Sequence, residues 1–368
     1  MQSVSHFESA SPPGTMKALQ IMLPVVPSFS ARVFFPYAIA AFARRAAQKG
    51  VSVPALLHGS DIAESDLVDP SVRVSYHQQR IVLDNALALM PEPSMPFDVG
   101  WAARFRTWGL LGMGADSAPT CREAAQFVAK YQAIVGPPVF NRTIEANGLI
   151  SSVYDDAVLI SDPLSREYAA CIEMLFTGDY AVMLELFGTD FKLSHVTLMY
   201  PEPAHAHLYH ETFGCPVLFG QPSNSLNYSD AWALNEPPLA NPLTFAMVST
   251  YCDIELDTIM KGGGPDAQVR QVLLAQSAPY PDLETVAAGL GMRPRTLRRK
   301  LDSSGTSFRE LLADVRKQEA IRYLRETDLT QEEIASRLGF SDGANFRQAF
   351  RRWASMPPGA YRRMASLA

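Results

Sequence analysis

Two stretches near the C-terminal end of the chain decide its fold: Leu283–Leu301, LETVAAGLGMRPRTLRRKL, and Glu333–Trp353, EIASRLGFSDGANFRQAFRRW. Within them Val286–Met292 aligns with Ile334–Phe340, because each segment has an apolar residue, a small residue and then a Leu-Gly-apolar sequence. Glycine adopts positive φ without a steric penalty, so it is common where a helix ends in a tight turn. Each stretch therefore predicts a short helix followed by such a turn.

A second helix is expected after each turn. Leu297 and Leu301 in the first stretch correspond to Phe346 and Phe350 in the second, once one extra residue is allowed there. Apolar residues four positions apart lie on the same side of a helix, so each pair can pack its helix against the preceding one. The sequence thus predicts two helix-turn-helix units.

The opposite face of each second helix carries side chains suited to nucleic acids. They are Arg295, Thr296, Arg298 and Arg299 in the first unit, and Asn345, Arg347, Gln348, Arg351 and Arg352 in the second. Arginine binds phosphate oxygens and guanine edges, while asparagine and glutamine read adenine edges. A helix with this surface fits the major groove of double-stranded DNA. The alternative interpretation is a helical core whose basic face is merely solvated.

The two units are expected to occupy two grooves. The arginines of the first unit should read bases or bind phosphates in one groove. Asn345 and Gln348 should read bases in the other, where the arginines of the second unit bind phosphates. A long helix from about Thr306 to Glu326 would hold the second helices roughly 34 Å apart, the separation of successive major grooves.

The second unit contains a specific pattern: IA-x-x-x-GF-S, then F-x-x-x-F, a proline and a Tyr-Arg pair. Its residues are Ile334-Ala335, Gly339-Phe340-Ser341, Phe346, Phe350, Pro357 or Pro358, and Tyr361-Arg362. In this pattern the chain resembles the AraC/XylS family of bacterial transcription regulators, over roughly Pro279 to Arg363. The resemblance implies an all-α, sequence-specific DNA-binding domain. Gly343-Ala344 departs from the family's larger polar residues, so the second unit is expected to be the weaker reader of bases.

Charge is distributed unevenly along the chain. The net charge is −6, but residues 266–368 carry 17 Lys and Arg against 12 Asp and Glu, whereas the other residues carry 15 against 26. A basic domain behind an acidic body is typical of a DNA-binding module fused to a domain that does not face DNA. Lys261–Pro265, KGGGP, predicts a flexible linker and a domain boundary near residue 262.

The cysteines and the N-terminal sequence indicate a cytoplasmic protein. No CxxC pair occurs, and the thiols are expected to be reduced and mostly buried; they are Cys121, Cys171, Cys215 and Cys252. The first residues lack the basic start and apolar run of a signal peptide. Prolines and an arginine interrupt Ala18–Ala41, which is therefore a poor membrane span. We expect a soluble protein that has no membrane association and no cofactor.

Residues 17–262 are predicted to form an α+β domain, preceded by a disordered tail over residues 1–16. Its first half should be helical, over Ser30–Gly50, Val53–His58, Val72–Met90, Phe97–Trp108, Leu110–Gly114 and Pro119–Val135. Its second half should be mixed α/β with a small antiparallel sheet. Strands are expected over Val139–Asn147, Ile150–Ile160, Leu193–Tyr200, Val217–Phe219 and Ser225–Tyr228, and helices over Pro163–Phe187 (interrupted at Gly178), Pro203–Phe213 and Asn241–Ile259. Asn147-Gly148 is a strong hairpin signal.

A second set of motifs lies in this domain. They include Leu110-Leu111-Gly112, Ser117-Ala118-Pro119-Thr120, Pro203, His205, Tyr209, Phe213–Val217, Phe219-Gly220, Asn224, Leu226 and Tyr228. Over roughly Pro24 to Pro242 they resemble the N-terminal effector domain of the branch of the AraC/XylS family that includes the ornithine-utilisation regulator. The resemblance implies that residues 17–262 bind a small molecule and dimerise, and that residues 263–368 bind DNA.

Few residues stand out as effector ligands. His205 could hydrogen-bond an effector, and Trp101 and Trp108 could line an apolar pocket, although core packing is the alternative for such aromatics. His207 and His210 lie three residues apart, but no carboxylate or thiolate cluster with ligand spacing accompanies them, so the sequence predicts no metal site.

The leading hypothesis is a transcription regulator, more specifically an activator, controlled by an effector. Its expected partners are promoter DNA, a small molecule and RNA polymerase, and a homodimer is left open. One alternative is an alkyl-acceptor repair enzyme fused to the same module, which would need an activated cysteine. Another is a DNA-binding protein whose first domain only dimerises. A ligand-sized pocket would distinguish the first hypothesis from the last.

Overall fold

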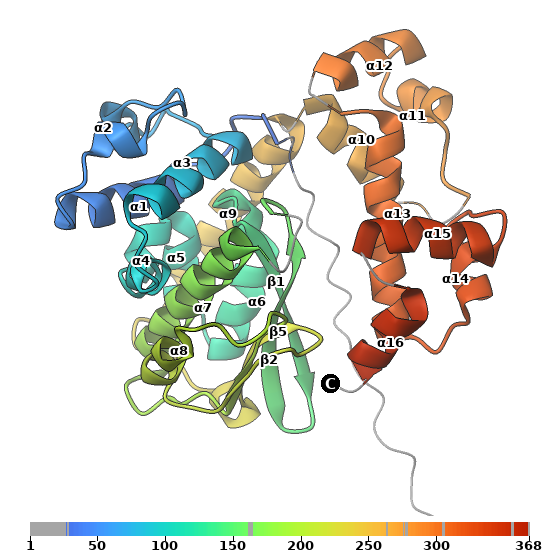
Figure 1. Cartoon of the computed structure of the whole chain (residues 1–368). Coiled ribbons are helices and arrows are strands. Elements are labelled where there is room, and N and C mark those ends of the chain that lie inside the picture. The colour runs from blue at the N-terminus through green and yellow to red at the C-terminus, as the bar shows by residue number, and fades with distance from the viewer. Residues whose placement is uncertain are drawn as a thin grey trace, which may run out of the picture.

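The computed structural model, drawn in Figure 1, describes Pro27 and residues 29–160, 165–262, 264–274, 276, 279–303, 306–354 and 357–366. The predicted disordered tail, residues 1–16, lies outside these residues. The first half of the domain over residues 17–262 is helical where the structure describes it, as predicted. Its helices are α1 Tyr37–Gln48, α2 Val53–Leu56, α3 Tyr76–Leu89, α4 Met95–Trp101, α5 Leu110–Asp116 and α6 Cys121–Tyr131, with 3₁₀ turns at Glu64–Val68, Phe105–Trp108 and Gln132–Ile134.

The predicted helix from Ser30 is wrong at its start. α1 begins only at Tyr37, because Phe34 in the segment before it forms an isolated antiparallel bridge with Val74. The Phe34 side chain is fully buried, so this short pairing anchors the start of the fold. The same bridge delays the predicted helix from Val72, which begins after Ser75, whose hydroxyl accepts from a backbone N–H of the first turn.

A five-stranded sheet follows, in the order β1-β2-β5-β3-β4. Its strands are β1 Val139–Ala146, β2 Leu149–Ala157, β3 His195–Thr197, β4 Val217–Leu218 and β5 Asn224–Ser229. The hairpin signal at Asn147-Gly148 is confirmed: both residues have positive φ, 54° and 79°, as a type I′ turn requires. Figure 1 shows α7, Arg166–Phe187, in front of the sheet and α6 behind it.

One strand pair differs from the predicted antiparallel sheet. β4 runs parallel to β3, with Val196 opposite Val217 and Thr197 opposite Leu218. Helix α8, Ala206–Phe213, lies between these strands in the chain and returns it to the same end of the sheet. A parallel pair needs such a crossover, so the sheet is mixed.

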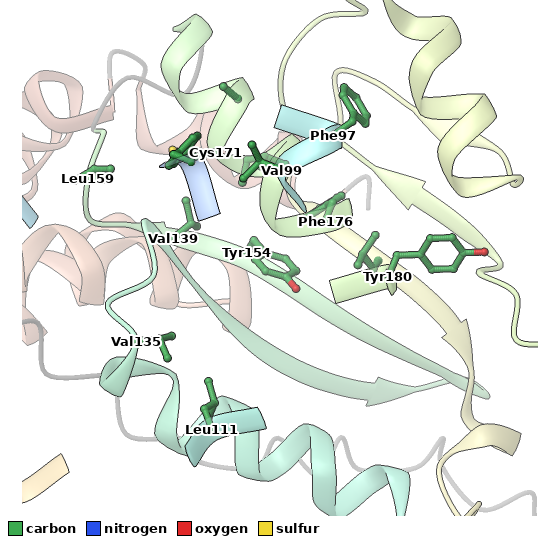
Figure 2. Close-up of a cluster of buried hydrophobic side chains, with 14 of the residues drawn as sticks. Phe97, Val99, Leu111, Val135, Val139, Tyr154, Leu159, Cys171, Phe176 and Tyr180 are labelled. Atoms are coloured by element: carbon green, nitrogen blue, oxygen red, sulfur yellow. The ribbon is translucent and has the colours of Figure 1, made fainter. Parts of the chain in front are cut away.

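Gly178 does not interrupt α7, contrary to the prediction. The helix continues through it, and its neighbourhood is where α4 crosses α7 closely. A Cβ at Gly100 of α4 would lie 2.3 Å from the backbone oxygen of Met174 and 2.9 Å from the Cβ of Thr177. The lack of a side chain at Gly100 therefore allows the close packing of the two helices, and Gly178 lies opposite it at ordinary contact distance. Figure 2 shows Val99 of α4, Phe176 of α7 and Tyr154 of β2 in the buried cluster beside this crossing.

The glycine-rich segment is helical on both sides, so the predicted flexible coil at Lys261–Pro265 is wrong for the described residues. Helix α9 covers Pro242–Gly262 and α10 covers Gly264–Leu274, while Gly263 is not described. Gly264 has φ of 85°, which allows the chain to change direction there. The buried Ile259 of α9 and Ala267 of α10 supply the tertiary contacts that override the low helix propensity of glycine.

The C-terminal part is all-α, as predicted. Its remaining helices are α11 Leu283–Gly289, α12 Pro294–Ser303, α13 Phe308–Glu326, α14 Gln331–Arg337, α15 Gly343–Ala354 and α16 Pro358–Ser366. Buried apolar residues of the described chain form one cluster within residues 33–259, a second within 269–315 and a third within 320–361. Each helix-turn-helix unit thus has its own core.

We expect Gly100→Ala to destabilise the first domain, because the new methyl would overlap the backbone of α7. The expected loss in the free energy of unfolding is about 1–3 kcal/mol, typical of overpacking. Thermal unfolding followed by circular dichroism measures it. Gly289→Ala is the matched control: a Cβ there meets open space within a helix, so it should be neutral or mildly stabilising. Equal stability of Gly100→Ala and wild type would contradict the close crossing.

Candidate DNA-binding surface

The first helix-turn-helix unit is built by α11 and α12. Asp282 caps α11, its carboxylate accepting from the backbone N–H of Thr285 at 2.8 Å. Gly291 has φ of 66°, and the N–H of Met292 donates to the carbonyl of Ala287 at 2.8 Å. This turn directs α12 back across α11, so the predicted start and turn of the unit are confirmed.

The second unit repeats this geometry in α14 and α15. Gly339 has φ of 69°, and the N–H of Phe340 donates to the carbonyl of Ala335 at 2.9 Å. Thr330 and Glu333 form a capping box at the start of α14. The bonded positions are those that align in the two sequence stretches, so the predicted register of the repeat is confirmed.

Helix α13 contributes to both cores. Leu311 and Val315 belong to the core of the first unit, and Ala320 and Leu324 to that of the second. The predicted apolar pairs, Leu297 with Leu301 and Phe346 with Phe350, are buried in these cores. The 19 residues of α13 span about 28 Å at 1.5 Å per residue, and the two units are arranged along this length (Figure 1).

Arg316 lies at the middle of α13, between the two cores. It donates to the carbonyl of Gly339, in the turn of the second unit, at 3.0 Å. Its guanidinium lies 4.9 Å from the ring centre of Phe340 and 5.8 Å from that of Tyr280, which precedes α11. Both contacts fall within the range of cation–π attraction. Arg316 thus connects the two units.

The predicted DNA-facing side chains lie on exposed helix faces. Arg295, Arg298 and Arg299 of α12 are exposed and Thr296 is half-buried, while all five predicted residues of α15 are exposed. A surface hollow of about 350 Å³ lies on α15, lined by Ala344, Arg347, Gln348, Arg351 and Arg352. The second helix of each unit, its recognition helix, therefore exposes its predicted basic side chains, and α15 presents the amide of Gln348 beside them.

Two of the predicted side chains of α15 have partners within the protein. Asn345 donates to the Ser341 hydroxyl at 2.7 Å and to the Asp342 carboxylate at 3.0 Å. Arg347 pairs with Glu332 of α14 at 3.1 Å. Gly343 is buried, and a Cβ there would lie 2.6 Å from a carboxylate oxygen of Glu332. Glu332 is a flexible and largely exposed side chain that can shift, so this contact does not explain the departure of Gly343 from the family pattern.

The effector candidates of the first domain have different neighbours. The Nε2 atom of His205 lies 2.8 Å from Oε1 of the buried Glu173 carboxylate. The same oxygen accepts a hydrogen bond from the Tyr209 hydroxyl at 2.5 Å. Trp101 is 43% exposed at the end of α4, and its ring lies 6.2 Å from that of Tyr180. Trp108 is half-buried and packs against the core of the domain. His205 is thus part of an internal polar network with Glu173.

A second internal carboxylate lies under the hairpin. Asp179 of α7 accepts from the hydroxyl of Tyr154 on β2, and burial raises its pKa to about 7.

In the described part of the chain, no group of three or more His, Cys, Asp or Glu residues is arranged to hold a metal ion. Nor does a helix there have the length and apolarity needed to cross a membrane.

Comparison with known protein families decides what this architecture is. Residues 50–237 match the arabinose-binding domain of AraC transcription regulators, N-terminal, and residues 286–364 match a helix-turn-helix domain. The chain belongs to the AraC family of transcription regulators. The resemblance seen in both sets of motifs is thereby confirmed, as is the predicted fold class.

The chain is similar to two curated relatives over very different shares of its length. It is 34% identical to the ornithine utilization regulator of Pseudomonas aeruginosa over 316 residues, which is 86% of this chain and 92% of that one. It is 41% identical to the urease operon transcriptional activator of Escherichia coli over 80 residues, 22% of this chain and 27% of that one. The crystal structure of the regulator CdpR from P. aeruginosa aligns with 89% of this chain and 98% of its own, at 23% identity and a TM-score of 0.46.

The regulator also contains functional candidates that the sequence patterns did not reveal. In the sequence, Arg316 is one of several charged residues on a long predicted helix. Only its position between the apolar residues Val315 and Ala320 indicates a role. Glu332 resembles a surface acid but pairs with the recognition helix. Glu173 carried a usable signal, because a carboxylate between Ile172 and Phe176 interrupts an otherwise apolar helix face.

We expect Arg316→Met to weaken binding to DNA that engages both units. Methionine retains the aliphatic stem but loses the bond to Gly339 and both aromatic contacts, together about 1–2 kcal/mol. Affinity should fall about tenfold, measured by fluorescence anisotropy on a selected duplex. Inserting one base pair between the half-sites of the duplex should lower the affinity of the variant less than that of wild type, because the two units of the variant are less rigidly coupled.

Arg309→Met is the control, since Arg309 is exposed on the first turn of the same helix. It should retain wild-type affinity and spacing preference. If Arg316→Met retains both as well, Arg316 does not set the relative placement of the units.

Proposed function

We propose that this AraC-family regulator activates transcription by binding two successive major grooves of one promoter site and responding to a small molecule. The observation that carries the proposal is the pair of exposed recognition faces on α12 and α15, joined through α13. RNA polymerase is the proposed partner at the promoter. The name of the urease operon transcriptional activator, which matches 80 residues of this chain, supports activation rather than repression.

The proposed division of labour follows the local contacts. α12 would read bases through Arg295, Arg298 and Arg299, which no contact described above engages within the protein. α15 would use Gln348 for bases and Arg351 and Arg352 for phosphates. Before contacting DNA, Arg347 would have to break its ion pair with Glu332, and Asn345 would have to break its hydrogen bonds to Ser341 and Asp342. The free-energy cost of breaking these contacts makes α15 the weaker base reader. For an exposed ion pair such as Arg347–Glu332 this cost is at most about 1 kcal/mol.

We further propose that residues 17–262 bind the effector and form a homodimer, and that residues 263–368 bind DNA. The match to an arabinose-binding-type domain supports a small, polar effector. Because the ornithine utilization regulator is 34% identical over 86% of this chain, ornithine is the first compound to test. Effector binding would act by shifting the population of DNA-competent dimers.

A non-enzymatic role is proposed because the thiols are poorly suited to nucleophilic chemistry. Burial raises the pKa of Cys121, Cys215 and Cys252 to about 11 and that of Cys171 to about 12. A nucleophilic cysteine needs a lowered pKa, since the thiolate is the reactive form. These thiols are therefore poor candidates for the methyl acceptor of a repair enzyme. The named relatives are transcription regulators, which agrees with this proposal.

We expect Arg299→Ala to relax sequence preference. The full chain is first used to select duplexes from a random library, and binding is then competed with random DNA at physiological salt. If Arg299 grips a guanine, the variant loses about 1–3 kcal/mol on the selected duplex and little on duplexes altered at that base pair. Arg44→Ala, at an exposed arginine of α1, should bind like wild type. No enrichment of any sequence by the wild-type chain would refute the proposed function.

We expect an effector to raise the thermal stability of the first domain in the full chain. Ornithine, other amino acids, fatty acids and aromatic acids are titrated separately while unfolding is monitored. A melting temperature that rises with ligand concentration, as binding linkage requires, identifies the class. If no class shifts the transition, an N-terminal domain that only dimerises is favoured.

A further inference from the structure

A buried carboxylate of α7 has an oxygen that its surroundings do not use. The Oε1 atom of Glu173 accepts from both His205 and the Tyr209 hydroxyl, as described above. Within the described part of the chain, the other oxygen, Oε2, accepts no hydrogen bond. A buried polar atom normally has a partner, because leaving it without one is costly. Oε2 is therefore an acceptor that the described residues leave without a donor.

The negative charge of Glu173 is also poorly balanced. Among the residues that the structure describes, no lysine or arginine pairs with it, and its ion-pair partner is His205. Histidine is charged only when it is protonated, so the carboxylate lacks a counter-charge whenever His205 is neutral. Buried charges are normally paired with an opposite charge. A ligand that brings a positive charge would satisfy this site, whereas a neutral sugar would leave the charge uncompensated.

Aromatic rings lie beside both hydrogen-bond partners of this carboxylate. The ring of Phe97 on α4 is edge-on to the rings of Tyr209 and His205, with centres 5.0 Å and 6.4 Å apart. The ring of Phe219 lies 5.3 Å from that of Tyr209, and the Tyr200 hydroxyl lies 3.0 Å from the Tyr209 hydroxyl. Ring faces attract organic cations, most strongly where water is excluded. The aromatic surroundings therefore favour the same class of ligand as the carboxylate does.

His205 lies where this site meets the solvent. Its side chain is 25% exposed, whereas that of Glu173 is 4% exposed, so the imidazole covers the carboxylate. His205 directly precedes α8, which packs on α7 (Figure 1). Because it belongs to a turn and not to the helix, its side chain can move without breaking helical hydrogen bonds. A ligand can therefore reach Glu173 by displacing one side chain.

We propose that the first domain binds an organic ammonium ion at Glu173, and that the ammonium group takes the place of the His205 imidazole. A primary ammonium has three N–H donors, enough to bind both Oε1 and Oε2. Its positive charge would compensate the carboxylate, and its carbon chain would contact the rings of Phe97 and Tyr209. This inference rests on the effector binding of the proposed function, and it specifies the chemical class and the place of the effector.

Calorimetric titration of the full chain with L-ornithine and with the diamine putrescine tests the site. At least one of them should bind wild type. Glu173→Gln retains the shape of the side chain but loses its charge, so it should raise the dissociation constant at least about tenfold. The control Glu185→Gln alters a half-exposed carboxylate of the same helix, which pairs with Arg104 at 3.0 Å, and should bind like wild type. Glutarate, which is anionic, and L-arabinose, which is uncharged, should not bind.

A histidine variant distinguishes a ligand site from a purely structural network. His205→Ala removes the group that competes with the ammonium for the carboxylate, so the dissociation constant of the amine should fall about tenfold. His207→Ala, at an exposed histidine on α8, should leave this constant unchanged. If Glu173 and His205 only hold the fold together, both Glu173→Gln and His205→Ala lower the melting temperature and neither alters amine affinity.

The outcomes separate this inference from the proposed function. Amine binding that Glu173→Gln leaves intact would overturn the inference and leave the response to an effector standing. So would binding of glutarate, L-arabinose or a fatty acid without binding of either amine. Absence of binding by every compound, with DNA selection retained, would overturn the inference and the effector response but not DNA binding. Loss of DNA selection with amine binding at Glu173 intact would count against the proposed function alone.

Discussion

The relative placement of the two recognition helices depends on one helix and on one arginine at its middle. Along α13, the apolar residues of the first core end at Val315 and those of the second begin at Ala320. Arg316 stands at this change and contacts the turn of the second unit and an aromatic residue of the first. Two small cores that share only a helix could bend relative to each other. A half-buried cation between two aromatic rings resists such bending, because any displacement loses contacts on one side.

Local pattern predicted the C-terminal part well, because its elements depend on local interactions. Alignment of Val286–Met292 with Ile334–Phe340 predicted the correct register of both turns. Asp282 and Thr330 cap the helices that precede these turns. These features need only neighbouring residues: a cap, a positive φ and an apolar pair one turn apart. The exposure of the recognition faces followed from the same periodicity.

The failures in the first domain have a common cause, which is contact between distant residues. Nothing near Phe34 indicates that it pairs with Val74, and this pairing removed the first turns of two predicted helices. The parallel pairing of Val217 with Val196 likewise depends on a crossover rather than on either strand. Gly178 shows the limit of propensity, since a residue that weakens an isolated helix lies inside α7 without interrupting it, opposite the close approach of Gly100 of α4. The partners of Asn345 and Arg347 were equally hidden, because they are bonds that only the folded unit makes.

The shared helix has a consequence for how this domain can change over evolutionary time. One residue inserted between Arg316 and Ala320 would turn everything that follows by about 100° and advance it by 1.5 Å. The second recognition face would then point away from the duplex, although both units would remain individually intact. Because such a change is not gradual, we expect the residue count of this segment to tolerate insertions less than the loops elsewhere in the chain do. If both units bind one promoter site as proposed, the length of α13 sets the spacing of the half-sites.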